Sequence, residues 1–249
     1  MAAYASEIRM KHLDLTLPSP AENLAGDEAL LDWCEQNEGE KILRLWESPE
    51  MFVVVGYANK IAAEVNIAAC KANEIPIFRR CSGGGTVLQG QGCLNYALIL
   101  RIAENSALAG ISSANQFIME RNRAALETLL GGKKIKVRGH TDLVSGDQKF
   151  SGNSQRRRKN FLLFHGTFLL DFDLALVGQF LRMPSKEPDY RHSRSHDEFL
   201  TNLNLPVTEV KDALKKAWNA TEELRDFPEP EIQKLAAQKY STDEWNFKF

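Results

Sequence analysis

Apolar residues recur along this chain with two different periods, and the period changes from one segment to the next. Segments in which they repeat every three to four positions predict amphipathic helices, whereas segments in which they alternate or run continuously predict strands. The first pattern predicts helices over residues 24–36, 62–73, 113–130, 174–181, 207–218 and 229–240. The second predicts strands over residues 41–46, 51–55, 75–80, 94–100, 135–138, 142–144, 149–151 and 161–170.

Short polar connections between the predicted strands favour antiparallel pairing. Segments 41–46 and 51–55 are separated by a polar stretch that includes Pro49, and together they resemble a hairpin. Gly146 and Asp147 fit a two-residue turn before strand 149–151. The polar stretch 184–198 is expected to be a loop. Because hairpins outnumber strand–helix–strand crossovers, the pattern predicts an α+β fold with a mixed, mainly antiparallel sheet covered by helices.

The organisation of the chain is expected to be simple. It contains no internal repeat and no linker rich in proline, glycine or serine. Its 249 residues match a single α/β domain, which can run to about 250 residues. We therefore expect residues 1–249 to form one domain, in which residues 205–249 are a short helical appendage at the C-terminal end.

Charge and composition narrow the class of function. The 31 lysines and arginines nearly balance the 33 aspartates and glutamates, for a formal net charge of −2, so no nucleic-acid partner is expected. No apolar run approaches the roughly 18–20 residues that span a bilayer, and Glu7 and Arg9 interrupt the place where a signal peptide is apolar. We expect a cytoplasmic protein with no membrane partner. The four cysteines form no Cys-x-x-Cys pair and are expected to be reduced thiols.

A glycine-rich segment between two predicted strands is the most informative part of the sequence. It reads Arg79-Arg80-Cys81-Ser82-Gly83-Gly84-Gly85-Thr86-Val87. Three successive glycines raise the entropic cost of ordering the chain, which suggests that something must approach the backbone closely. Consecutive N–H groups without Cβ atoms can bind an anion, and the arginines add charge. The alternative is a tight turn or bulge. The spacing fits neither a Walker phosphate loop nor a dinucleotide fingerprint.

A second group of polar residues follows in the centre of the chain. Asp142, Lys149 and small polar residues lie within the stretch 139–153, and His165 lies in an apolar strand further on. Each residue has two interpretations. Lys149 is either a functional cation or an exposed strand residue whose stem lies along the sheet. Asp142 is a turn cap or a metal ligand, and His165 is a core histidine or a site residue. The basic run 156–159 is interpreted as a solvated loop.

Taken together, these segments resemble the lipoate–protein ligase branch of the biotin/lipoate ligase superfamily. The glycine segment is similar to the family's R-R-x-S-G-G-G-[AT]-V loop, Asp142-Leu143 with Lys149-Phe150-Ser151-Gly152-Asn153 resembles its N-D-L…K-x-S-G-[SN] pair, and His165-Gly166-Thr167 resembles its H-G-T-L-L strand. Order and spacing agree from Ala29 to about Leu203. The resemblance implies the catalytic-domain fold of the biotin/lipoate ligases.

The resemblance also implies an activity, with ATP and Mg²⁺ as cofactors and lipoic acid, or octanoic acid, as substrate. The acid is activated as an acyl-adenylate and passed to a lysine of a lipoyl carrier domain, in a glycine-cleavage protein, a 2-oxoacid dehydrogenase acyltransferase or a specialised lipoate-binding protein. Lys149 is implied to be the catalytic cation, and Asp142 the Mg²⁺ ligand. Substrate or nucleotide binding is implied for Arg80, Ser82, Gly83, Gly84, Gly85, Thr86, Val87, Asn95, Asp142, Lys149, Ser151, Gly152 and His165.

Several departures from the family pattern keep other functions open. Thr141 stands where many ligases have Asn, and the chain has no counterpart of the C-terminal domain of long ligases, so a small accessory ligase subunit is a further expected partner. The nearest rival is an octanoyl or lipoyl transferase, which needs a cysteine and no ATP. No cysteine follows Leu94, and Pro184-Ser185 occupies one of the two places where transferases carry it. A non-catalytic lipoate or adenylate binder and a biotin ligase are the remaining alternatives.

Overall fold

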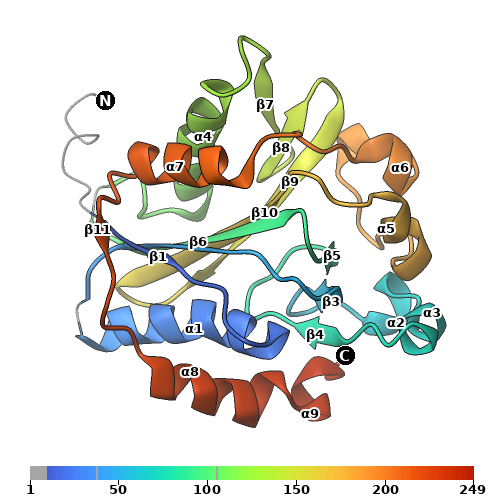
Figure 1. Ribbon diagram of the computed structural model, residues 1–249, viewed down its shortest axis with the longest axis horizontal. Coiled ribbons are helices and arrows are strands. Elements are labelled where there is room, and N and C mark those ends of the chain that lie inside the picture. Colours follow the sequence, from blue (N-terminus) through green and yellow to red (C-terminus); the bar gives the residue numbers. More distant parts are fainter. Residues whose placement is uncertain (1–9, 38, 105) are drawn as a thin grey trace.

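The computed structural model describes residues 10–37, 39–104 and 106–249. Glu7 and Arg9, on which the argument against a signal peptide rests, lie outside the described residues. Within the described part, one large sheet runs through the middle of the molecule (Figure 1). Its eight strands follow the order β11 (Glu222–Glu223), β1 (Lys11–Asp14), β2 (Ile42–Trp46), β6 (Cys93–Arg101), β10 (Phe161–Leu169), β9 (Gln148–Arg157), β8 (Asp142–Ser145) and β7 (Ile135–Arg138).

Most neighbours in the large sheet are antiparallel, from β2 across to β7. The strand β1 pairs in parallel with both β2 and β11 at the other edge. This arrangement confirms the predicted α+β fold with a mixed, mainly antiparallel sheet.

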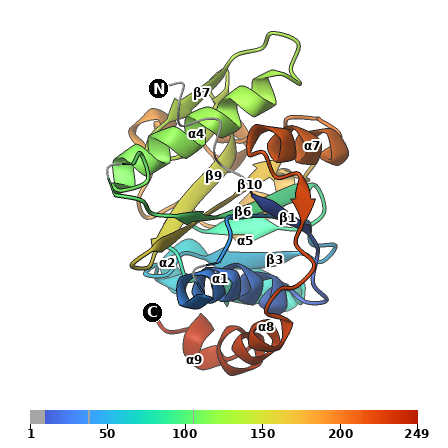
Figure 2. The ribbon, with the colours of Figure 1, turned by 90° about the vertical axis from the view of Figure 1, so that its left-hand side faces the viewer.

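Helices cover both faces of the large sheet (Figures 1 and 2). On one face lie α4 (Ile111–Glu127) and α7 (Val207–Ala217), and on the other lies α1 (Pro20–Asn37). Successive side chains of β6 point to opposite faces, as the pleat requires. Leu94, Tyr96 and Leu98 therefore join the core under α4 and α7, whereas Ala97 and Ile99 join the core under α1.

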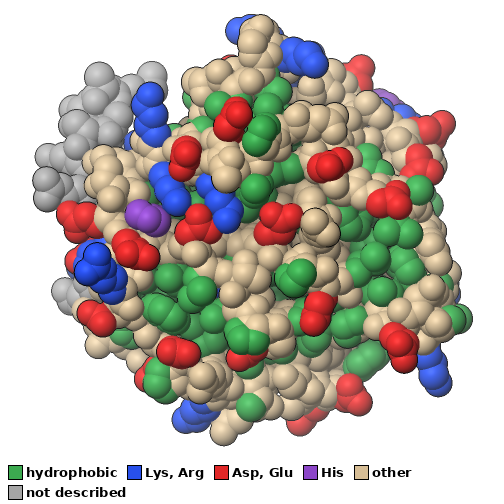
Figure 3. Space-filling view, in the orientation of Figure 1, with side chains coloured by type: hydrophobic (Ala, Val, Ile, Leu, Met, Phe, Trp, Pro, Cys, Tyr) green, Lys and Arg blue, Asp and Glu red, His purple; other side chains and the backbone are tan. Residues whose placement is uncertain are grey.

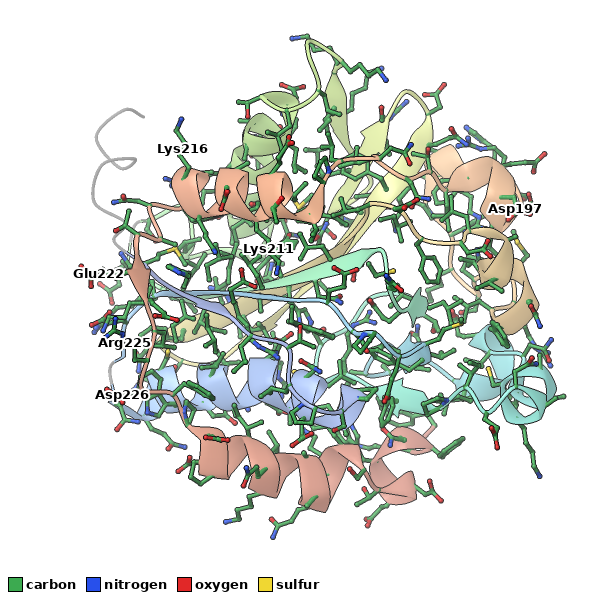
Figure 4. All side chains as sticks on the ribbon, in the orientation of Figure 1. Asp197, Lys211, Lys216, Glu222, Arg225 and Asp226 are labelled. Atoms are coloured by element: carbon green, nitrogen blue, oxygen red, sulfur yellow. The ribbon has the colours of Figure 1, made fainter. Side chains whose placement is uncertain are left out.

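Two ion pairs join α7 to β1, next to the edge strand β11. Lys211, labelled in Figure 4, and Lys215 lie one turn apart on α7. Their Nζ atoms approach the carboxylate of Asp14 on β1 at 2.6 Å and 3.2 Å. On the surface seen in Figure 3, acidic and basic side chains are interspersed.

A small second sheet contains β4 (Ile77–Arg79), β3 (Phe52–Val55) and β5 (Val87–Gln89) in that order. The predicted hairpin of segments 41–46 and 51–55 is therefore wrong. The strand β2 pairs with β1 and β6 in the large sheet, whereas β3 pairs with β4 and β5 in the small one. Both strands are buried along their whole length, so each needs partners on both edges, and a two-stranded hairpin cannot supply them.

The remaining helices are short. They are α2 (Ile61–Glu64), α3 (Ile67–Ala72), α5 (Ala175–Phe180), α6 (His196–Phe199), α8 (Glu229–Leu235), α9 (Asp243–Asn246), the 3₁₀ turn η1 (Asp189–Arg191) and the π-helical turn η2 (Ala236–Tyr240). The helices α8 and α9 lie below α1 in Figure 2, on the side away from the sheet.

Two predictions in this part of the chain are wrong. The single helix predicted over 62–73 is divided, because Val65 forms a bridge with Leu181 and Asn66 caps α3 by accepting a hydrogen bond from the N–H of Ala69. The predicted loop 184–198 contains η1 and most of α6. Ser195 and Glu198 form a capping box at the start of α6, and their spacing was the available signal for that helix.

Candidate active site

A cavity of about 1020 Å³ opens between the two sheets and the segment that carries η1 and α6. In Figure 1 the small sheet lies beside the ends of β6 and β10, which places the glycine segment at this junction. With one exception, the residues predicted for the site line this cavity: Arg80, Gly83, Gly84, Gly85, Thr86, Val87, Asn95, Asp142, Lys149, Ser151, Gly152 and His165. The exception, Ser82, is buried directly behind the wall, bonded to His165.

The glycine segment forms a loop between β4 and β5 that is shaped by Arg80. The guanidinium of Arg80 donates hydrogen bonds to the carbonyls of Gly83 at 2.6 Å and Gly85 at 2.7 Å. Gly84 has a φ of +88°, a backbone conformation that other residues rarely adopt, so the loop requires glycine there. A Cβ at Gly84 would also lie 2.9 Å from Arg80 Nη2 and would push the guanidinium aside. Arg80 therefore fixes the shape of the loop by binding the carbonyl groups of two loop glycines. The hydroxyl of Thr86 is buried in the cavity wall and has no partner among the described residues.

Lys149 and Asp142 meet on the neighbouring strands β9 and β8. A register shift between Leu143 and Val144 interrupts the ladder at this place. Lys149 Nζ lies 2.8 Å from Asp142 Oδ1, and both side chains are largely buried. A Cβ at Gly152 would lie 2.9 Å from Lys149 Nζ, so the glycine leaves room for the ammonium group.

Tyr190, which lies on η1, completes the surroundings of Asp142. Its hydroxyl donates a hydrogen bond of 2.7 Å to Asp142 Oδ2. Burial and the negative charge of Asp142 both raise the pKa of Tyr190, so the phenol stays protonated as a donor. Tyr190 was not predicted as a site residue, because it lies in the stretch predicted to be loop.

Thr141, which stands where many of the ligases that the chain resembles have asparagine, is bonded to β9, the strand that carries Lys149. Its hydroxyl donates to the carbonyl of Asn153 at 2.6 Å, and the amide of Asn153 donates back to the carbonyl of Thr141 at 2.6 Å. The same Asn153 amide donates to the hydroxyl of Ser151 at 3.1 Å. Through these hydrogen bonds to Asn153, Ser151 and Thr141 fix the position of this wall of the cavity.

A chain of buried polar groups runs behind the glycine loop. The imidazole of His165 on β10 lies between Asp27 and Ser82, with Nδ1 2.9 Å from Asp27 Oδ2 and Nε2 2.5 Å from Ser82 Oγ. Arg44 on β2 donates to Asp27 Oδ1 at 2.6 Å. Burial alone would raise the pKa of Asp27, but the hydrogen bond from His165 and the charge of Arg44 outweigh it and hold that pKa below 3.8.

Neither Asp27 nor Arg44 was predicted as part of the site. The available signal was a charged residue in an otherwise apolar setting, since Arg44 interrupts the strand sequence Ile42-Leu43-Arg44-Leu45-Trp46. Such a residue is costly to bury unless it is paired, so its presence indicates a partner.

Asn95 belongs to a closed ring of three side chains on the cavity wall. Its amide donates to Gln89 Oε1 at 3.1 Å, Gln89 donates to Thr167 Oγ1 at 2.7 Å, and Thr167 donates to Asn95 Oδ1 at 2.7 Å. Gln89 and Thr167 were not predicted. Apolar lining comes from Leu24, Trp46, Val54, Val87 and Leu169. The indole N–H of Trp46 is buried without a partner among the described residues.

The side chains of the cavity that could bind a metal ion are few. In the described part of the chain no cluster of three or more His, Cys, Asp or Glu side chains could hold one. Asp142 is a single carboxylate whose two oxygens each have one partner, Lys149 and Tyr190, which leaves further lone pairs on both. Such a residue fits Mg²⁺ only in the manner usual for nucleotide substrates, where the phosphates supply most of the ligands.

None of the four cysteines lines the cavity. Cys34, Cys70, Cys81 and Cys93 are all buried free thiols, and none is among the described residues that line the cavity. Burial raises the pKa of Cys34, Cys81 and Cys93 to about 12 in each case. At neutral pH these thiols carry no thiolate character, and the thiolate is the nucleophilic form of cysteine.

Comparison with known proteins gives the family. The sequence model of the lipoyl protein ligase A/B catalytic domain matches residues 19–219, which include the glycine loop, Lys149 and His165. The chain belongs to this family. The predicted resemblance to the lipoate–protein ligases is thereby confirmed, and so is the catalytic-domain fold that it implied.

Individual relatives of the lipoyl protein ligase family divide between two reactions. The chain is 27% identical over 266 residues to the octanoyltransferase LipM of Anoxybacillus flavithermus, covering 92% of this chain and 95% of that protein. It is also 27% identical over 240 residues to the lipoate-protein ligase A subunit 1 of Thermoplasma acidophilum, covering 90% of each. A crystal structure of lipoate-protein ligase A bound with ATP superposes with a TM-score of 0.78 at 26% identity, covering 96% of this chain and 98% of that one.

These similarities assign the chain to a family whose members are named for acting on lipoyl or octanoyl groups. The chain is 27% identical to both the transferase and the ligase, so sequence identity does not distinguish the two reactions. In the described part of the chain no helix is long and apolar enough to cross a membrane.

Proposed function

We propose that this chain is an ATP-dependent lipoate–protein ligase, which activates lipoate or octanoate as acyl-AMP and transfers the acyl group to a lysine of a lipoyl carrier domain. The observation that carries this proposal is the composition of the cavity wall. It combines the ammonium of Lys149 with a glycine loop, and it contains none of the four cysteines of the chain, which are buried free thiols.

An octanoyltransferase is the second candidate, and its support comes from relatives that carry that name. A transferase without ATP needs a nucleophile to hold the acyl group between the two carriers. Cys81 and Cys93, the cysteines nearest to the glycine loop in sequence, are buried with a pKa of about 12. Because a buried neutral thiol is a poor nucleophile, the ligase reaction is favoured.

The proposed reaction has two steps. In the first, a carboxylate oxygen of the acid attacks the α-phosphorus of ATP, a P–O bond forms, and pyrophosphate leaves. In the second, the lysine amine of the carrier attacks the acyl carbonyl, an amide C–N bond forms, AMP leaves, and the amine gives up its proton. Negative charge gathers on oxygen in both transition states, where fixed donors and cations stabilise it most.

Each part of the cavity has a proposed role in these steps. The ammonium of Lys149 stabilises the charge on the α-phosphate, and the N–H groups of the loop at Gly83–Gly85 bind the same phosphate. The apolar residues of the wall, such as Trp46 and Leu169, surround the acyl chain. Asp142 would hold Mg²⁺ together with the phosphates, and the ion would neutralise phosphate charge.

The proposed partners follow from the same reaction. The acceptor is a lipoyl carrier domain, and a small accessory subunit is proposed for the adenylation step. The relative from Thermoplasma acidophilum is itself named as subunit 1 of its ligase, which supports that second partner.

One assay tests the proposed function directly. Purified protein, alone and with the proposed accessory subunit, is incubated with ATP, Mg²⁺ and octanoate, with and without a lipoyl carrier domain, and the acyl-adenylate and the carrier mass are followed by mass spectrometry. We expect Lys149→Ala to lower adenylate formation by about 10²–10³-fold, as the loss of one transition-state donor does. The matched control is Lys136→Ala, which removes an exposed lysine from the nearby strand β7.

Two results would contradict the proposal. Carrier modification by Lys149→Ala at nearly the native rate would refute the role of the ammonium group. Carrier-to-carrier transfer of octanoate without ATP would identify the chain as a transferase.

A further inference from the structure

The polar chain behind the glycine loop connects a buried ion pair with the cavity. It runs from Arg44 through Asp27 and His165 to Ser82, and Ser82 Oγ lies 2.7 Å from Ser154 Oγ. Ser154 lines the cavity, directly opposite His165 in the ladder between β9 and β10. Its Cβ is 3.5 Å from the position of a Cβ on Gly84, so Ser154 adjoins the glycine loop.

The donors and acceptors of this chain determine where its protons lie. Arginine has no acceptor, so Arg44 donates to Asp27, and the ionised Asp27 can only accept. His165 must therefore carry a proton on Nδ1. With a neutral imidazole, Nε2 accepts and Ser82 must donate to it, which uses the single hydroxyl proton of Ser82. Ser154 then donates to Ser82 and presents only lone pairs to the cavity.

A second proton on His165 reverses this direction. Nε2–H then donates to Ser82, Ser82 donates to Ser154, and the hydroxyl proton of Ser154 is free to point into the cavity. The same serine thus accepts a hydrogen bond in one state and donates one in the other. An anionic group bound next to the glycine loop needs the donating state.

We propose that Asp27 and His165 form a proton-linked positioning pair, which takes up a proton when a carboxylate or phosphate binds beside Ser154 and thereby turns that hydroxyl into a donor. Asp27 is a positioning residue here, because it acts through the imidazole. The proton comes from solvent and rests on Nε2 of His165, and no bond other than N–H is formed. The inference rests on the proposed function for the nature of the anion, a fatty acid carboxylate or its adenylate.

The charges around the pair favour this linkage. Asp27 and Arg44 neutralise each other, so protonated His165 leaves the group with one positive charge, which an anion in the cavity compensates. Glu28, the next residue on α1, is held by Lys239 at 2.6 Å and by Arg158 at 3.6 Å. From β6, the residue opposite His165 is the apolar Ala97, and Arg80 faces the glycine loop from the end of β4.

Calorimetry of octanoate binding measures the proton directly. Sodium octanoate is titrated into the full chain without ATP at pH 7.5. Titrations in buffers of different ionisation enthalpy give the number of protons taken up as the slope of binding enthalpy against that enthalpy. We expect a positive slope of up to one proton for octanoate and none for octanamide, its neutral counterpart. Nitrogen-15 spectra of labelled histidine should show the His165 ring becoming doubly protonated as octanoate is added.

Variants separate this role from a structural one. His165→Gln should abolish the slope, because an amide takes up no proton at this pH. Ser154→Ala should weaken octanoate binding by about ten-fold, the loss of one charge-assisted hydrogen bond, while leaving Asp27 and Arg44 paired. Asp27→Asn should also abolish the slope. If Asp27→Asn fails to fold, His165→Gln and Ser154→Ala still provide the test. The matched control is Asp32→Asn, which removes a carboxylate of the same helix that pairs with Arg158.

Three results would overturn the inference: octanoate binding by the native chain with no slope, an unchanged slope in His165→Gln, or no binding of octanoate at millimolar concentration. The proposed function is judged separately by adenylate formation. A chain that binds octanoate with proton uptake but forms no adenylate even with the accessory subunit present, and transfers no acyl group from supplied acyl-AMP to the carrier, would disprove the ligase and leave the proton-linked pair standing.

Discussion

Replacing Gly152 by alanine tests whether the exact place of the Lys149 ammonium matters. Gly152 follows Lys149 on β9, and an added Cβ would lie 2.9 Å from Lys149 Nζ and 3.0 Å from its Cε. These atoms belong to the far end of a flexible side chain, so they can move aside without disturbing the backbone. The substitution Gly152→Ala therefore displaces the cation while leaving the strand in place.

The structure sets the size of the displacement. Ordinary contacts of a Cβ lie at 3.4–4 Å, so the ammonium and its methylene must retreat by about 0.5–1 Å. That movement also lengthens the 2.8 Å contact with Asp142. A misplacement of about 1 Å in an active site can cost about 10²-fold in rate, equivalent to about 2.7 kcal/mol in the barrier. The free energy of unfolding should stay the same or rise by about 0.4–1 kcal/mol, because alanine restricts the unfolded chain.

The assay compares two quantities in the same protein. Exchange of labelled pyrophosphate into ATP in the presence of octanoate and the accessory subunit reports adenylate formation, and urea unfolding of the chain reports its stability. Gly178→Ala on α5 is the control, since a Cβ there meets no atom within 4 Å and its φ is not positive. If Gly152→Ala kept full exchange activity while Lys149→Ala lost it, the claim that the exact position of the ammonium matters would be refuted. Only the presence of its charge would then matter.

Further predictions concern the thiols and the buried carboxylate. Exchanging Cys81 and Cys93 for serine should leave carrier modification within about two-fold of native when adenylate is supplied, since the thiols are not reactive; a folded double variant without activity would revive a thioester mechanism. The pKa of Asp27 in the folded state lies below 3.8, so its ionised form stabilises the fold at neutral pH, and this contribution is lost as pH falls through the folded-state value. Urea unfolding from pH 6 to pH 3 should therefore show a smaller acid-induced loss of stability in Asp27→Asn than in the native protein; equal losses would contradict this.

The small sheet shows where sequence patterns stop being informative. Residues 51–55 and 75–80 were both predicted as strands, but a continuous apolar run does not say which strand it pairs with. The structure pairs β3 in parallel with β4 and antiparallel with β5, and this pairing is what carries the glycine loop to the cavity. Short segments such as α6 were missed for another reason, because a single turn of helix has too few residues to show a period.

The sequence by itself determined the local chemistry of the site. The informative features were consecutive glycines, a lysine three positions before another glycine, and a histidine followed by glycine. Each reflects a local requirement for backbone conformation or for close approach to the backbone. Such requirements can be recognised from neighbouring residues in the sequence. The tertiary structure alone decided which distant groups act on them. Asp27 reaches His165 across 138 residues of sequence, and Tyr190 reaches Asp142 across 48. Such contacts form only when apolar faces pack and bury charged groups together. Each buried charge then needs a partner, and the local sequence does not show which distant residue supplies it.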